Sequence, residues 1–211
     1  IKGGIIMTNY VQSNTQKKGL TIKDLITIGV FTAIIYVCDL LGGTVFAITP
    51  TLTFYFPIGA AVFAGPVYLL LIAKVPKRGP IMIMGILGGI IGFMTGMHWA
   101  MEVSGIIAAI LADFVAGLKN YRSKRVNIIS YIVYAFGTTG TYFAYFINPQ
   151  AWVSAMLNNG TTQEYINTMQ ASANKWVLII MIVGTILVSG ISGLVGSKLL
   201  KKQFEKAGIT A

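Results

Sequence analysis

Long apolar stretches separated by short polar connections dominate the chain and predict a membrane protein. Each stretch can cross about 30 Å of hydrocarbon as a helix. The predicted spans are residues 25–41, 54–73, 81–97, 100–118, 128–146 and 176–199. The predicted fold class is therefore an all-α membrane protein with six transmembrane helices in one compact bundle.

Lysine and arginine gather at alternate ends of these spans. One side of the predicted membrane holds almost all of them: Lys17, Lys18, Lys23, Lys74, Lys77, Arg78, Lys119, Arg122, Lys124, Arg125, Lys198, Lys201, Lys202 and Lys206. The opposite connections, residues 42–56, 96–99 and 147–174, are bordered by one basic residue, Lys175. Because Lys and Arg are enriched in cytoplasmic connections, both termini are predicted to be cytoplasmic.

The pattern divides the chain into a tail and one membrane domain. Residues 1–20 are polar and are predicted to be a flexible cytoplasmic N-terminal tail, and residues 21–211 a six-span domain. Residues 1–6 precede Met7, and we expect them to be vector-derived or the product of an upstream start. Thr21 and Asp24 form a capping box that predicts the start of the first helix.

Composition supports the membrane assignment. The chain is 55% hydrophobic and 10% charged, with a mean hydropathy of +0.74, which leaves too few polar residues to cover a soluble globule. The net charge of +10 lies in short clusters beside the spans, so no nucleic-acid partner is expected. Cys38 is the one cysteine, which excludes an intrachain disulfide.

Small residues recur at four-residue spacing on three spans and predict close helix packing. The positions are Gly85, Gly88, Gly89, Gly92 and Gly96 on the third span, Gly29 and Ala33 on the first, and Ser189, Ser192, Gly193 and Gly196 on the sixth. We expect the glycines of the third span to lie inside the bundle.

The connection 42–56, GGTVFAITPTLTFYF, is too apolar for a solvated loop and too interrupted by glycine and proline for a simple helix. It is predicted to fold into the mouth of the bundle. The connection 147–174 is predicted to form two short helices, the first capped by Asn148 and the second started by a capping box of Thr161 and Glu164.

Each of these short helices has an aromatic residue and a methionine on one face, four residues apart. The pairs are Trp152 with Met156, and Tyr165 with Met169. The two helices could form a lid over a binding site or lie at the membrane interface, and the sequence leaves both open.

Few ionisable residues fall near the spans, and each is a candidate for function. Asp39 and Glu102 lie near outer ends, and Asp113 lies nearer the cytoplasm. His98 and Glu102, four residues apart, are predicted to form a hydrogen-bonded pair, because two groups are too few for a closed metal site. Asp113 is predicted to be a structural partner of Tyr or Ser side chains or of the basic cluster, with proton coupling as the alternative.

Motifs of common enzymes are missing from the sequence. It contains no GxxxxGK[ST], HExxH or GxSxG. We expect no catalytic residue, metal or cofactor, and the alternative is a membrane enzyme that uses His98 and Glu102 as acid and base. The two halves do not look like inverted repeats, which weakens the case for a secondary transporter.

The sequence resembles the substrate-binding S components of energy-coupling factor (ECF) vitamin transporters, from about Lys17 to Lys206. The resemblance rests on the six-span pattern and on LITIGVFTAIIYV in the first span, where Gly29 and Ala33 take the places of an AxxxA motif. In detail it looks like the Trep_Strep branch, with its glycine-rich third span.

This resemblance implies that Gly29 and Ala33 dock on an ECF transmembrane coupling subunit carried by two cytoplasmic ATPase subunits. It also implies that the ligand binds near the outer side, under the loop between the first two spans. The protein would then lie in a prokaryotic cell (plasma) membrane, as a multi-pass protein. The whole S component would then topple in the bilayer to release the ligand inside.

Aromatic and polar residues that face the outer mouth suit a flat heterocyclic ligand. The candidates are Phe46, Thr49, Tyr55, His98, Trp99, Glu102, Asn148 and Trp152. The predicted function is a high-affinity substrate-binding membrane subunit of an ECF-type ABC importer for a vitamin or related micronutrient. The alternative is a proton-coupled secondary transporter of a small molecule, in which Asp113 or Glu102 would be essential.

Overall fold

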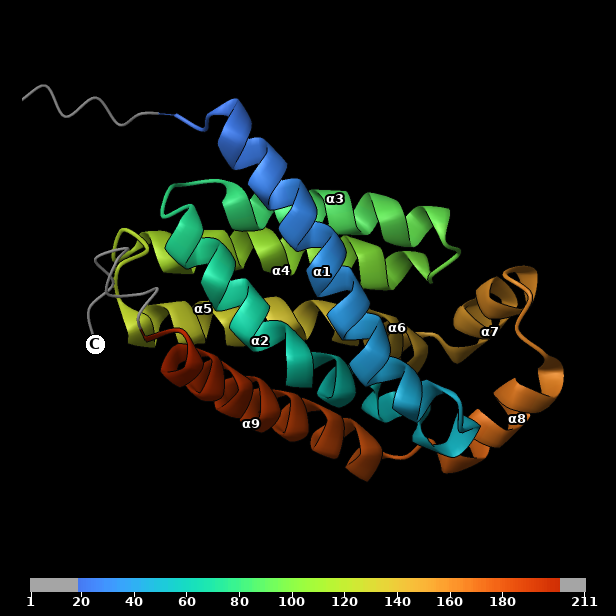
Figure 1. The fold of residues 1–211 in the computed structure, drawn as a ribbon. Helices are drawn as coiled ribbons and strands as arrows, with labels where there is room; N and C mark the ends of the chain where they lie inside the picture. Colours follow the sequence, from blue (N-terminus) through green and yellow to red (C-terminus); the bar gives the residue numbers. More distant parts are fainter. Residues whose placement is uncertain (1–18, 202–211) are drawn as a thin grey trace, which may run out of the picture.

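A computed structural model describes residues 19–201, and these residues form a bundle of helices (Figure 1). In chain order the helices are α1 (Ile22–Ala47), the 3-10 helix η1 (Pro50–Tyr55), α2 (Phe56–Lys74), α3 (Pro80–Met94), α4 (Trp99–Gly117), α5 (Lys124–Ala135), the 3-10 helix η2 (Phe136–Thr139), α6 (Gly140–Ile147), α7 (Pro149–Asn158), α8 (Gln163–Ser172) and α9 (Lys175–Leu199). The predicted all-helical architecture is confirmed.

Within the described residues, four helical segments are long and apolar enough to cross a membrane. They are Ile22–Ala47, Pro50–Lys74, Trp99–Gly117 and Lys175–Leu199. The third predicted span is the 15-residue α3, which is only about 22 Å long at 1.5 Å per residue. The fifth is divided into α5, η2 and α6, which follow one another without a gap. The prediction of six transmembrane helices is therefore confirmed only in part.

Helix α2 lies at the centre of the bundle, because two-thirds of its apolar stretch is buried and α1, α5 and α9 pack against it. Its contact with α1 depends on two glycines. A Cβ on Gly42 would collide with the carbonyl of Gly59, and a Cβ on Gly59 with that of Gly42. This close approach accompanies the continuation of α1 as a helix to Ala47, beyond residue 41, where the predicted first span ends.

The rest of that connection enters the bundle as predicted. Pro50 starts the 3-10 helix η1, and Phe54 within it is fully buried. Its ring packs near Tyr142 and Tyr145, with centroid separations of 5.6 and 5.5 Å. This apolar segment therefore contributes Phe54 to a small aromatic cluster at this end of the bundle.

Small residues pack two further helix pairs. Ser192 of α9 donates a hydrogen bond to the Val62 carbonyl at 2.7 Å, and a Cβ on Gly196 would meet the backbone of Pro66. On α3, a Cβ on Gly85 or Gly89 would meet side chains of α4. The predicted internal packing is confirmed at these positions, whereas Gly88 and Gly96 have no atom within 4 Å of an added Cβ.

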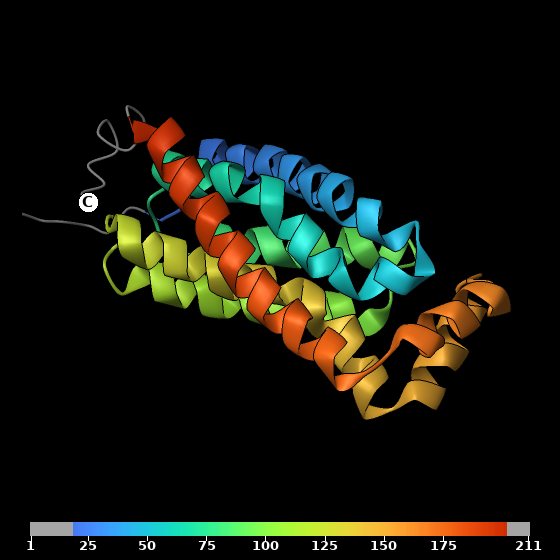
Figure 2. The ribbon, with the colours of Figure 1, turned by 90° about the horizontal axis from the view of Figure 1, so that it is seen from below.

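The start of α1 and the end of α9 lie at one end of the bundle, and α7 and α8 lie at the other (Figures 1 and 2). The first end carries an ion pair of 2.7 Å between Lys77 and Asp24. The predicted capping box of Thr21 and Asp24 is present there. The predicted flexible tail lies outside the described residues except for positions 19 and 20, as do Lys17, Lys18, Lys202 and Lys206.

Asp113 organises the turn that precedes α3. Its carboxylate accepts hydrogen bonds from the backbone N–H of Gly79 at 3.0 Å and of Ile81 at 3.2 Å. The hydroxyl of Tyr121 donates to it at 3.0 Å. Asp113 is thus a structural acceptor at a helix N-terminus, with a tyrosine partner as the sequence predicted.

The connection after α6 forms the two predicted short helices. The Asn148 side chain caps α7 by accepting from Ala151 N–H at 3.1 Å. The predicted capping box of Thr161 and Glu164 is wrong by one residue, because α8 is capped by Thr162, which accepts from Tyr165 N–H at 3.3 Å.

Candidate functional site

A cavity of about 320 Å³ lies beneath α7 and α8, and we call it the outer chamber. Its lining is mainly aromatic and sulfur-containing, with a few polar groups. The main side chains are Thr53, His98, Thr141, Tyr142, Trp152, Met156, Tyr165 and Met169. The predicted faces of the two short helices are confirmed, since both aromatic–methionine pairs line this chamber. Such a lining suits a largely apolar ring held by a few polar contacts.

Three hydrogen bonds hold the short helices over the outer chamber. Trp152 Nε1 donates to Thr141 Oγ1 at 2.9 Å, and the Tyr165 hydroxyl donates to the Ala47 carbonyl at 2.6 Å. Asn159 donates to the Gly96 carbonyl at 3.0 Å. The two helices are therefore a roof that is tied to α6, to the end of α1 and to the loop before α4.

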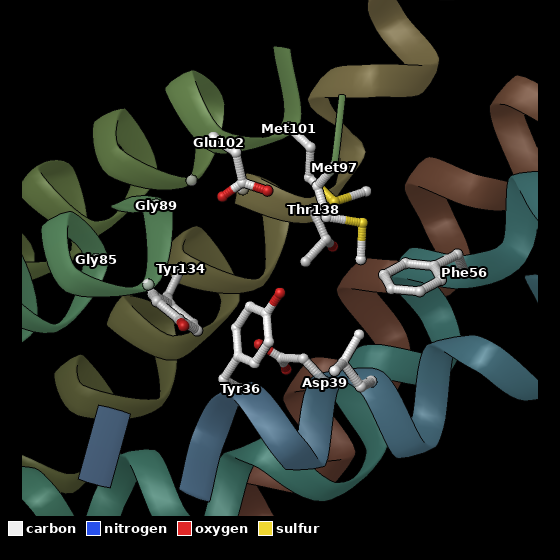
Figure 3. A pocket seen from close by; sticks show the side chains of 14 residues that line it. Tyr36, Asp39, Phe56, Gly85, Gly89, Met97, Met101, Glu102, Tyr134 and Thr138 are labelled. Carbon is white, nitrogen blue, oxygen red and sulfur yellow. The ribbon is translucent and has the colours of Figure 1, made fainter. Parts of the chain in front are cut away.

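A second, smaller cavity of about 80 Å³ lies deeper between α1, α3, α4 and η2, and we call it the inner chamber (Figure 3). Its polar lining comes from Tyr36, Asp39, Glu102, Tyr134 and Thr138. Figure 3 shows Asp39 and Glu102 entering from opposite walls, on α1 and α4. Gly85, Gly88 and Gly89 of α3 contribute backbone without side chains to one wall.

Four apolar side chains line both chambers and so form the boundary between them. These side chains are Leu40, Phe56, Met97 and Met101. Methionine side chains are flexible, so this boundary can repack around an occupant. The chambers together form one site with an apolar, aromatic outer part and a polar inner part.

The carboxylate of Glu102 lies against α3 because position 92 is glycine. A Cβ on Gly92 would overlap all three atoms of the Glu102 carboxyl group. Glu102 is 7% exposed. Neither Glu102 nor Asp39 forms a hydrogen bond or ion pair with another of the described residues. Both carboxyl groups are therefore free to meet a ligand.

His98 caps α4 and lines the outer chamber. Its Nδ1 accepts from the Ala100 N–H at 3.2 Å, so the neutral ring carries its hydrogen on Nε2. Burial lowers the pKa of His98, because the imidazolium would lose its hydration. Within the described residues Nε2 has no partner, and the predicted hydrogen-bonded pair with Glu102 is not formed.

The eight residues predicted to contact ligand fall into two groups. His98, Glu102 and Trp152 line the chambers. The other five do not line either chamber. Phe46 and Tyr55 contact each other edge-on, and Asn148 caps α7. Thr49 is exposed at the start of η1, and Trp99 is 58% exposed.

Four residues of the inner chamber were not predicted to contact ligand: Tyr36, Asp39, Tyr134 and Thr138. Tyr36 and Asp39 stand three residues apart on α1, a spacing that places them on one helix face. That spacing was visible in the sequence, but the partners across the chamber come from α4, α5 and η2. Only the tertiary arrangement, in which α1 packs against α2 and α3, identifies the shared cavity.

The predicted docking residues lie on an open face of α1. Ala33 is exposed, and a Cβ on Gly29 would have no atom within 4 Å. Apolar neighbours on the same face, Val30 and Val37, are 53% and 52% exposed. This face can meet lipid or another helix.

The arrangement can enclose a small molecule beneath a roof of two helices. The described residues contain no group of three or more His, Cys, Asp or Glu side chains that could hold a metal ion.

Comparisons with curated proteins and with solved structures found no match. A family model described as "Hypothetical bacterial integral membrane protein (Trep_Strep)" matches residues 22–206. This match covers most of the chain, which therefore belongs to the Trep_Strep family of bacterial integral membrane proteins.

Proposed function

We propose that this protein is the substrate-binding S component of an ECF-type importer for a vitamin or related micronutrient. The observation that carries the proposal is the roofed pair of chambers at the end of the bundle opposite the basic clusters. Basic clusters mark the cytoplasmic side, so the chambers open toward the outside. A binding subunit of an importer needs its site on that side.

The proposal includes six membrane crossings with both termini in the cytoplasm of a prokaryotic cell, in its plasma membrane. The start of α1 and the end of α9 lie at the same end of the bundle, as an even number of crossings requires (Figure 1). In this arrangement α3 crosses together with its flanking residues, and α5, η2 and α6 cross as one continuous rod. A short crossing can be accommodated by thinning of the bilayer.

The open face of α1 supports a partner within the membrane. Gly29 and Ala33 present no large side chain there, and small residues let a second helix approach closely. The partner would be the transmembrane coupling subunit. Two cytoplasmic ATPases would supply the energy for transport, since the sequence of this chain contains no GxxxxGK[ST] motif for ATP. The protein itself would be a binding subunit and not an enzyme.

The test is purification of the tagged protein in mild detergent from its native membrane, with the bound proteins identified by mass spectrometry. One membrane coupling subunit and two ATPases in near-equal amounts are the expected result. Ala33→Trp should remove them, whereas Ile107→Trp, at a 53% exposed position on α4, should not. Purification of the wild-type chain alone, even after crosslinking in the membrane, would refute the proposal.

The carboxyl groups of the inner chamber favour one alternative, a proton-coupled secondary transporter. In that case Asp39 or Glu102 would carry the proton. Uptake would then collapse when a protonophore is added and would survive deletion of the cellular coupling ATPases. Asp113 is a weaker candidate for this role, because two backbone N–H groups and a tyrosine hydroxyl already occupy its carboxylate.

A further inference from the structure

The inner chamber holds two carboxyl groups and no basic side chain. Asp39 projects from α1 and Glu102 from α4 into the same cavity (Figure 3). Glu102 is more than nine-tenths buried, and the described residues supply no hydrogen-bond or ion-pair partner to either group. The basic residues of the described chain lie at the membrane ends, and none lines either chamber.

An ionised carboxylate inside a membrane protein is costly unless it is paired. A charged residue at the centre of a span is costly, and a buried charge without a counter-ion is destabilising. Two such groups facing one cavity repel each other as well. Either protonation of the carboxyl groups or a positive group between the chamber walls removes this cost.

The remaining lining indicates what kind of positive group fits. The described residues gather no group of three or more His, Cys, Asp or Glu side chains here, and two carboxylates alone do not complete the roughly six to eight oxygen ligands of Ca²⁺. Tyr36 and Tyr134 place aromatic rings in the chamber, and such rings attract organic cations through their faces. Of the α3 glycines that line the chamber, Gly88 has no atom within 4 Å of an added Cβ, so no side chain fills the space beside it.

We propose that the inner chamber binds the positively charged nitrogen group of an organic substrate, such as an amine, an amidinium or a cationic heterocycle. Asp39 and Glu102 pair with this group, and the outer chamber encloses the apolar or aromatic remainder beneath α7 and α8. His98, whose Nε2–H has no partner among residues 19–201, offers a hydrogen-bond donor to that remainder. This inference names the substrate class of the importer proposed above, and its transport role depends on that proposal.

The test uses three probes of nearly the same shape and different charge: benzamidine, benzamide and benzoate. Each is titrated into the purified full-length protein in detergent, and binding is followed by the thermal unfolding midpoint and by tryptophan emission. We expect benzamidine to bind at least about tenfold more tightly than benzamide, a preference typical of a charge pair that excludes water. Benzoate should not bind.

Asp39→Asn and Glu102→Gln are the informative variants, since each keeps the shape of the side chain and removes its charge. Each should weaken benzamidine binding by about tenfold or more. Without probe, each variant should be at least as heat-stable as the wild type, because it relieves an unpaired charge. Glu164→Gln on α8, which alters an exposed carboxylate, is the matched control and should bind as the wild type does.

Several results would overturn the inference. Equal binding of benzamide and benzamidine, or no response to benzamidine up to its solubility limit, would show that the chamber does not select a positive group. Unchanged benzamidine binding in the double variant Asp39→Asn/Glu102→Gln would remove the carboxyl groups from the site. Loss of heat stability in both probe-free variants would indicate a structural role for these groups instead.

The substrate class and the importer role can be tested separately. Co-purification with a coupling subunit and ATPases does not depend on the charge of the ligand, so a failed probe series with an intact complex refutes only the substrate class. Selective binding of benzamidine by a chain that purifies alone would retain the substrate class and refute the importer.

Discussion

Replacing Gly42 with alanine tests how closely α1 and α2 must pack. The added Cβ would lie inside contact distance of the Gly59 carbonyl oxygen, and 2.7 Å from its carbon. Both obstacles are backbone atoms in the middle of a helix–helix contact, so no side chain can rotate away. We therefore expect a cost near the upper end of the usual range for overpacking, about 3 kcal/mol.

Alanine also has a higher helix propensity than glycine, which offsets about 0.8 kcal/mol of this cost. The net loss is then about 2 kcal/mol, which lowers the unfolding midpoint of a chain of this size by about 4–8 °C. The measurement is thermal unfolding of the purified protein in one detergent, followed by far-ultraviolet circular dichroism.

Gly29→Ala is the matched control on the same helix. An added Cβ there meets no atom within 4 Å, so only the propensity term remains and the midpoint should stay the same or rise by about 2–3 °C. Equal midpoints for the two variants, or a fall for Gly29→Ala as large as that for Gly42→Ala, would refute the assignment of Gly42 to an interhelical contact.

Three further outcomes are expected. Ala33→Trp should abolish uptake by cells while the purified variant still binds ligand, and loss of binding would show that the docking and ligand surfaces are not separate. Asp113→Ala should lower the free energy of unfolding by about 3 kcal/mol, because three hydrogen-bond donors lose their acceptor. A change in the thermal unfolding midpoint of less than about 2 °C would contradict the structural role of this carboxylate. Ligand addition should change tryptophan emission in the wild type and in Trp176→Phe, since Trp176 is 63% exposed at the start of α9, but the change should be reduced in Trp152→Phe.

The architecture of the chain was largely predictable, because it follows from local properties. Apolar length and the placement of Lys and Arg are read directly from the sequence, and capping residues such as Thr21 and Asn148 act within one helical turn. The paired aromatic and methionine residues of the short helices were predictable for the same reason. Their helical spacing alone places them on one face.

The site was predictable only in part. Of the residues assigned to ligand contact, His98, Glu102 and Trp152 line the chambers, while others near the outer end serve as caps or lie exposed. Proximity to the outer end of the membrane says which layer a residue occupies. It does not say whether the residue faces a cavity, a neighbouring helix or lipid.

Hydropathy and capping thus determined by themselves that this chain is a helical membrane protein and where several of its helices begin. Tertiary packing alone decided that α1 stays helical through Gly42, because a close contact with Gly59 stabilises a segment whose local propensity is poor. It also brought Asp39 to the same chamber as Glu102, although 62 residues lie between them. The distinction is physical: a helix depends on neighbours within one turn, whereas a binding chamber depends on which faces of distant helices meet.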